Sequence, residues 1–182
     1  MIKNRNDLKN YIKADWAHYG GDKPSVKDYV LHNEKWFIYY YLIALRHIEY
    51  YTNVQKKGLR FLFWFFLYKR LGFKLKFTIY PNTCESGLAI YHCGDMIWVK
   101  QNCSIGKNCI LRPGVVFGEK ITYEKECPVR VGDNVDFGLG VRIFGSICIG
   151  NNVTIGANSV ITKDIPDNVV VCGAPAKIVK WK

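Results

Sequence analysis

The sequence predicts a mainly β protein, in which a short N-terminal α-helical region precedes a parallel β-helix of hexapeptide repeats. Two observations predict this fold class. The composition changes near residue 77: residues 1–76 hold 15 Lys and Arg against 6 Asp and Glu, with 18 of the 27 aromatic residues, whereas residues 77–182 hold 11 basic against 9 acidic residues. In the second part, large apolar residues recur every six positions through ten repeats: Val99, Ile105, Leu111, Phe117, Val131, Phe137, Ile143, Ile149, Ile155 and Ile161.

A second small or apolar residue follows each of these positions after four residues, and glycine follows the first position in six of the repeats. In a hexapeptide coil both apolar positions point into a narrow prism, while Gly, Asn and Asp supply the turns. The strands of each coil pair with strands of the coils above and below. This pairing satisfies the hydrogen bonds of the backbone N–H and C=O groups without helices. A helix would space its apolar residues three and four apart, and a β-sandwich would alternate them with period two. Neither alternative fits the repeat.

The repeat frame slips by two residues between Phe117 and Val131. The charged segment 119–130 cannot enter the prism, so we expect it to protrude as a loop from one corner, where functional sites are common. This divides the chain into a helical, aromatic and basic region over residues 1–76, a hexapeptide β-helix over residues 77–168, and a C-terminal segment over residues 169–182.

In the N-terminal region, the capping-box pattern at Ser25 predicts a helix that starts near residue 26 and continues through residues 36–51. A second helix is predicted over residues 57–71, with Gly72 as its C-cap. Both are rich in aromatic residues and flanked by Lys and Arg. They fit helices that lie on a membrane surface. They also fit a cap on the open end of the prism and on neighbouring subunits. The two interpretations are compatible.

The N-terminus has no secretory-signal pattern, and the longest apolar runs are shorter than the roughly 20 residues that cross a bilayer. The seven cysteines form no CxxC pair, which indicates reduced thiols. We therefore expect a cytoplasmic protein, and the basic aromatic helices suggest the inner face of the membrane as its place. No groove-reading or RNA-binding signature accompanies the positive charge, so we expect no nucleic-acid partner.

One histidine, His92, lies in the repeat half of the chain, in a segment where the six-residue register is broken. An imidazole that titrates near neutral pH is suited to act as a general base. The alternative is that His92 only fills a gap at the first, irregular coil.

Several segments resemble the serine-acetyltransferase-like branch of the hexapeptide acyltransferases, including its polysaccharide O-acetyltransferases. The resemblance covers residues 79–179 and lies in IYPNTCESGLAIYHCGDMIWV, CPVRVGDNV, IGANSV, DIPDN and CGAPAKIV. It implies a left-handed β-helix, a homotrimer with active sites between neighbouring prisms, acetyl-CoA as co-substrate, and His92 as the general base.

The resemblance also implies positions for the bound coenzyme. Four residues would lie along its pantetheine arm and phosphates: Gly118, Leu139, Ala157 and Lys163. Lys177 would hold a phosphate as a point charge. Backbone N–H groups around Gly118 or residues 138–140 are candidate oxyanion donors, although each of these glycines could serve only a turn.

The chain departs from serine acetyltransferases at its site. Thr78 stands where the family has the carboxylate partner of the histidine, and Glu85 or Asp95 could substitute for it. Glu126 and Cys127 stand where the family has an Arg-His pair that holds the amino-acid acceptor. We therefore expect an acetyl-CoA-dependent O-acetyltransferase that acts on a sugar hydroxyl in capsular or exopolysaccharide biosynthesis. The alternative is a serine O-acetyltransferase of cysteine biosynthesis.

Two further classes compete with these hypotheses. A zinc-dependent β-helix hydratase of the γ-carbonic-anhydrase type would need three histidine ligands, whereas the repeat half holds one, so we expect no metal. A catalytically inactive β-helix scaffold would not depend on His92 at all.

Overall fold

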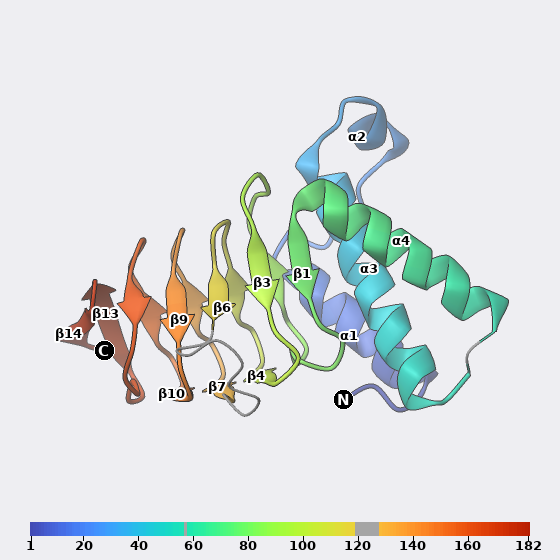
Figure 1. Cartoon of the computed structure of the whole chain (residues 1–182). Coiled ribbons are helices and arrows are strands. Elements are labelled where there is room, and N and C mark those ends of the chain that lie inside the picture. Colours follow the sequence, from blue (N-terminus) through green and yellow to red (C-terminus); the bar gives the residue numbers. More distant parts are fainter. Residues whose placement is uncertain (57, 119–127) are drawn as a thin grey trace.

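The computed structural model describes residues 1–56, 58–118 and 128–182. Four helices come first in the chain: α1 (Arg5–Ala17), α2 (Val26–Val30), α3 (Glu34–Asn53) and α4 (Leu59–Leu75). They gather at one end of a left-handed parallel β-helix, whose opposite end carries the C-terminal hairpin (Figure 1). The predicted fold class is confirmed.

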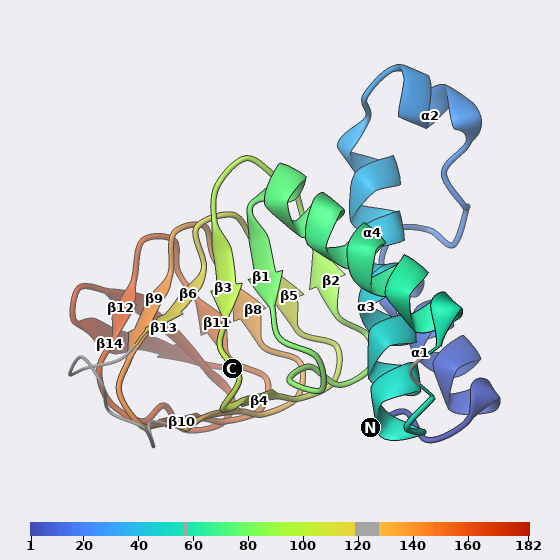
Figure 2. The ribbon, with the colours of Figure 1, turned by 45° about the vertical axis from the view of Figure 1, so that its right-hand side comes forward.

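Three sheets form the sides of the β-helix. Sheet A contains β1 (Phe77–Ile79), β3 (Ile97–Val99), β6 (Val116–Gly118), β9 (Arg142–Phe144) and β12 (Val160–Ile161). Sheet B contains β4 (Cys103–Ile105), β7 (Val129–Val131) and β10 (Ile147–Ile149). Sheet C contains β2 (Ala89–Ile90), β5 (Ile110–Leu111), β8 (Asp136–Phe137), β11 (Thr154–Ile155), β13 (Val169–Gly173) and the antiparallel β14 (Ala176–Trp181). Figure 2 shows these sides from a second direction, with α1, α3 and α4 together at the β1 end.

The two apolar positions of each repeat fill the prism, as the spacing predicts. The rings of Phe117 and Phe137 meet edge to face at 5.6 Å. Cys109 is fully buried and acts as a small apolar residue, and burial raises the pKa of its thiol to about 11. The buried inward polar residue Ser159 is satisfied, because its hydroxyl donates to Gly156 O (2.7 Å) and accepts from Gly173 N–H (3.2 Å).

The corner between sheets B and C is built on asparagine. Its turn residues adopt positive φ angles of 54–59°, which asparagine tolerates better than other residues with a β-carbon. Their side-chain amides form a ladder from coil to coil: Asn108 to Asn134 (3.3 Å), Asn134 to Asn152 (3.1 Å) and Asn152 to Asn168 (2.9 Å). The asparagine of this turn therefore recurs from coil to coil, as the inward apolar residues do.

The helices differ from their sequence prediction in three respects. The helix expected from residue 26 to 51 is interrupted at His32, whose φ is +54°, so that α2 and α3 are separate. Helix α1 was not predicted. Helix α4 passes through Gly72 and ends at Leu75, and its C-cap residue Lys76 takes the left-handed conformation. A β-carbon at Gly72 would lie 2.8 Å from Phe77 O, so this glycine allows the close approach of α4 to β1 instead of ending the helix.

A buried ion network joins the helices to the first coil of the prism. Arg46 on α3 is fully buried and contacts Asp15 on α1 (2.7 Å) and Glu49 on α3 (2.9 Å), which are also buried. Backbone groups of the first coil complete the network: Arg46 donates to the carbonyls of Cys84 and Glu85, Asp15 accepts from the N–H groups of Gly87 and Leu88, and Glu49 accepts from Asn82 N–H. Because every charge has partners, these helices are held in one position against the coil.

Candidate active site

The turns that lead from sheet C into sheet A form one continuous edge of the prism, covering residues 91–96, 112–115, 138–141 and 156–159. Backbone hydrogen bonds connect them: Gly114 N–H to Met96 O (3.0 Å), Gly140 N–H to Pro113 O (2.9 Å) and Asn158 N–H to Leu139 O (2.7 Å). His92 lies in the first turn, Leu139 in the third and Ala157 in the fourth. The expected base and two of the expected coenzyme contacts therefore share one edge.

His92 has a φ of +67°, an uncommon conformation for a residue with a β-carbon, and 71% of its side chain is exposed. Its Nδ1 lies 2.7 Å from Oε1 of Glu34, the first residue of α3. The other carboxylate oxygen of Glu34 accepts the Cys93 N–H at 3.1 Å. Glu34 was missed by the sequence analysis, because it is 58 residues away in the chain and belongs to no motif that was recognised.

The residues that follow helix α1 hold the segment just before His92. The Tyr19 hydroxyl donates to Ile90 O (2.6 Å) and lies in place to accept from Ile90 N–H (2.7 Å). Burial raises the pKa of Tyr19, so the hydroxyl keeps its proton at neutral pH. Tyr91 adds a longer bond from its hydroxyl to His18 O (3.4 Å). The turn that presents His92 is thus fixed by contacts from α3 and from the two residues that follow α1.

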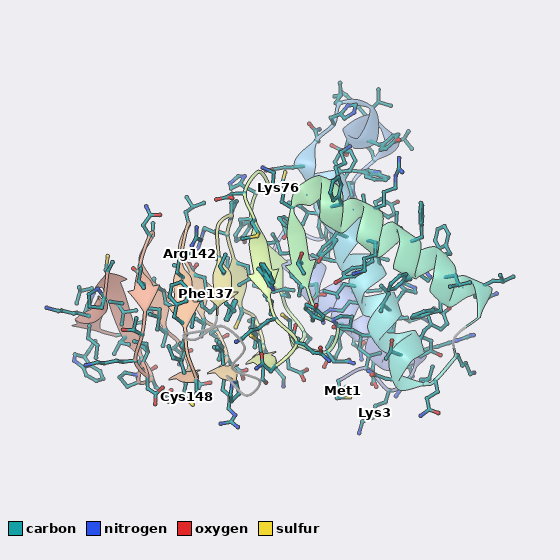
Figure 3. All side chains as sticks on the ribbon, in the orientation of Figure 1. Met1, Lys3, Lys76, Phe137, Arg142 and Cys148 are labelled. Carbon is teal, nitrogen blue, oxygen red and sulfur yellow. The ribbon has the colours of Figure 1, made fainter. Side chains whose placement is uncertain are left out.

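A cavity of about 480 Å³ lies beside this turn, between the end of α4 and strand β1. Thr78, Lys69, Lys76 and Met96 are among the residues that line it. Lys76 lies at the junction between α4 and β1 (Figure 3), and its Nζ donates to Gly94 O (3.1 Å) in the His92 turn. Two lysines and apolar side chains therefore border a cavity that reaches the His92 turn at Met96.

The two carboxylates expected to orient His92 have other partners. Glu85 accepts from the Tyr11 hydroxyl and lies 3.2 Å from the N-terminal ammonium of Met1. Asp95 accepts the Met96 N–H at 2.7 Å. Within the described residues, the hydrogen-bonded carboxylate of His92 is Glu34.

The remaining expected coenzyme residues lie away from the His92 edge. Gly118, at the end of β6, and the exposed Lys163 lie at the corner from sheet A to sheet B, whereas Lys177 lies on β14. A β-carbon at Gly118 would lie 2.7 Å from the Phe144 ring, so this glycine makes room for an aromatic ring.

Two of the candidate oxyanion donors are already engaged, which corrects the sequence expectation. Gly138 N–H donates to Ile155 O (2.9 Å) and Gly140 N–H to Pro113 O (2.9 Å), because both groups connect stacked coils. Glu126 and Cys127 lie outside the described residues. In residues 1–56, 58–118 and 128–182, no three His, Cys, Asp or Glu side chains come together as a metal site.

Comparisons with known proteins agree with the repeat and the fold. Residues 128–163 match the family model described as the hexapeptide repeat of succinyl-transferase. Serine acetyltransferase of Staphylococcus aureus is 37% identical over 87 residues, which are 48% of this chain and 41% of that protein. The chain thus spans about two fifths of the length of this curated relative.

Solved structures match almost the whole chain, including the helices. Serine acetyltransferase from Brucella abortus strain S19 covers 97% of this chain with a TM-score of 0.68 at 25% identity, and the match covers 69% of that protein's chain. Its complex with coenzyme A gives a TM-score of 0.69 over 97% of this chain and 68% of the other. The fold and the repeat define the chain as a hexapeptide-repeat β-helix protein. Its structural likeness is to serine acetyltransferases.

Proposed function

We propose that the chain is an acetyl-CoA-dependent O-acetyltransferase in which His92 is the general base. The observation that carries this proposal is the hydrogen bond between His92 Nδ1 and the Glu34 carboxylate. A carboxylate only accepts hydrogen bonds, so Nδ1 carries the hydrogen and the Nε2 lone pair is available as a base.

The reaction follows from this arrangement. Nε2 accepts the proton of the attacking hydroxyl while its oxygen bonds to the thioester carbonyl carbon. The C–S bond then breaks, and the imidazolium returns the proton to the departing CoA thiolate. The coenzyme A complex of the Brucella abortus serine acetyltransferase supports acetyl-CoA as the donor. The likeness to serine acetyltransferases also supports the expected homotrimer, whose mass by light scattering would be three times the 21.0 kDa of the chain.

The comparisons favour serine over a sugar as the acceptor. The sequence by itself favours a sugar, with serine as the alternative. The Staphylococcus aureus relative and the Brucella abortus structural neighbour are both serine acetyltransferases. A sugar hydroxyl of a capsular or exopolysaccharide precursor stays the second candidate. The observation that favours it is the sequence Glu126-Cys127, which by resemblance replaces an Arg-His pair that binds an amino-acid acceptor.

Release of CoA from acetyl-CoA, measured with L-serine and with a panel of sugars and nucleotide sugars, separates the two acceptors. The variant His92→Asn is expected to lose on the order of 10²–10⁴-fold in kcat, because the proton acceptor is removed while asparagine still tolerates positive φ. The matched control is His32→Asn, which removes another exposed imidazole at positive φ. Equal rates for His92→Asn and the unaltered protein would instead support an inactive scaffold.

We also propose that α4 lies on an anionic lipid surface, at the cytoplasmic face of a membrane. Its outward side exposes six large apolar residues: Leu59, Leu62, Phe63, Phe65, Phe66 and Phe73. The helix carries four basic residues, Arg60, Lys69, Arg70 and Lys74, and no acidic one. This combination suits a helix that lies in the interface of acidic lipids. No helix among the described residues is long and apolar enough to cross a bilayer.

Sedimentation with vesicles tests this contact. The protein is expected to bind phosphatidylglycerol vesicles, to bind phosphatidylcholine vesicles weakly, and to lose binding in a Phe63→Ser/Phe66→Ser variant. If the variant instead changes the oligomeric mass and leaves vesicle binding unchanged, a second copy of the chain covers this face.

A further inference from the structure

We infer that Glu34 is the positioning carboxylate of His92, so that helix α3 supplies part of the active site of the β-helix. This inference rests on the proposed function, because it assigns Glu34 a role in the proton transfer by His92. Nothing in the repeat itself points to this residue, which belongs to the region otherwise regarded as a cap.

The Glu34 carboxylate uses both of its oxygens on the His92 turn. One oxygen lies 2.7 Å from Nδ1, a distance typical of charge-assisted hydrogen bonds, and the other accepts the Cys93 N–H at 3.1 Å. The first contact sets the tautomer and the direction of the ring. The second holds the backbone of a turn whose φ of +67° is otherwise unfavourable.

A purely helix-stabilising role does not account for this geometry. An acidic residue in the first turn of a helix is favourable in any protein, because the exposed N–H groups attract negative charge. The N-cap residue Asn33 makes no side-chain capping bond, which leaves such N–H groups available to Glu34. The hydrogen bonds of Glu34 go to the His92 turn instead.

The position of Glu34 is set by the buried part of the same helix. Arg46 lies on α3 twelve residues after Glu34 and is bonded to Asp15 and to the carbonyl groups of Cys84 and Glu85 in the first coil. The coil then continues through β2 to His92. Helix α3 therefore contacts the first coil near Cys84 and again at His92. The helix is a rigid element that brings the Glu34 carboxylate to the His92 ring.

Two measurements on the full-length protein test the inference. In protein labelled with ¹⁵N-histidine, NMR reports which ring nitrogen of His92 carries the hydrogen, and the His92→Asn variant assigns the signal. We expect the Nδ1–H tautomer in the unaltered protein and its loss in Glu34→Gln. The kcat for CoA release is expected to fall by about tenfold or more in Glu34→Gln with little change in KM, because the isosteric amide keeps the shape but not the charge.

Two further variants complete the test. Glu34→Asp keeps the charge and is expected to retain more of kcat and of the Nδ1–H tautomer than Glu34→Gln. Asp22→Asn removes an exposed carboxylate from the same helical region and is expected to leave both readings unchanged. An unchanged tautomer and kcat in Glu34→Gln, with His92→Asn inactive, would overturn the inference and leave the proposed function intact. Full activity in His92→Asn would overturn the proposed function itself.

Discussion

The β-helix and the helical region at its β1 end are stabilised in different ways. The coils of the β-helix repeat one arrangement, with apolar residues inside and backbone hydrogen bonds to the coils on either side. The helical region instead buries Asp15, Arg46 and Glu49, together with the backbone groups that they bind. A repeat tolerates a local defect because each coil contacts only its neighbours. A single buried ion network does not tolerate the loss of one charged residue, because each charge depends on the others.

The comparison also bears on function. His92 is carried by the first coil, whereas the carboxylate that contacts it comes from α3. The two regions are therefore not a catalytic part and an accessory part. The helical region sets the orientation of His92, which the β-helix carries.

The largest effect on stability is expected from Arg46→Ala. Removing the guanidinium leaves Asp15 and Glu49 buried without a counter-charge, which should cost about 3–5 kcal/mol of unfolding free energy. Urea unfolding measures this loss, and hydrogen exchange should show α1 and α3 losing protection while β9 and β12 keep theirs. The exposed Arg60→Ala is the control and should change stability by less than about 0.5 kcal/mol. Equal loss of protection in all coils would mean that the two regions unfold as one.

The Arg46→Ala defect should also depend on pH. Burial raises the pKa of Glu49 above its ordinary value of 4.5, and Arg46 opposes this rise. A carboxyl group with a raised pKa in the folded state contributes stability that is present below pH 4.5 and is lost as the pH rises through the folded value. The defect should therefore be smaller at pH 5 than at pH 7, and a defect that grows on acidification would contradict this account.

An intermediate effect is expected from Gly138→Ala in the β-helix. The added β-carbon would lie 2.6 Å from Ala157 N and 2.7 Å from Ile155 O, which are backbone atoms of the next coil. Forcing these coils apart should cost about 1–3 kcal/mol. Hydrogen exchange should show weaker protection near β8 and β11 and unchanged protection in α1 and α3. A loss of protection in the helices as well would show that a defect in one coil spreads beyond its neighbours.

The smallest effect is expected at Glu85, where α1 meets the first coil. Partial burial raises the pKa of this carboxyl group, but the Tyr11 hydroxyl, the N-terminal ammonium and Arg46 together lower it below 4.5. The group then contributes stability that is present above pH 4.5 and is lost as the pH falls through the folded value. Because 43% of the side chain is exposed, Glu85→Gln should cost under about 1 kcal/mol at pH 7. The difference from the unaltered protein should narrow below pH 4.5, and a constant difference would refute the assignment.

Particular elements show how far sequence reasoning reached. The spacing of six located the coils from Val99 to Ile161, because inward positions of a prism recur at a fixed interval. The break in that spacing located His92. The helices were predicted less well: α1 was missed, and the end of α4 was placed at Gly72, because a glycine that ends a helix looks the same in sequence as one that permits close packing.

By itself, the sequence determined that residues 77–168 form a β-helix and that one imidazole lies at its irregular first coil. A period is a local property of the chain, so it can be read without knowing which distant segments meet. Only the tertiary structure decided that Glu34 contacts His92 and that Glu85 and Asp95 do not. The contact between Glu34 and His92 joins residues 58 apart, and it depends on how α3 is held by the buried charges of Arg46, Asp15 and Glu49.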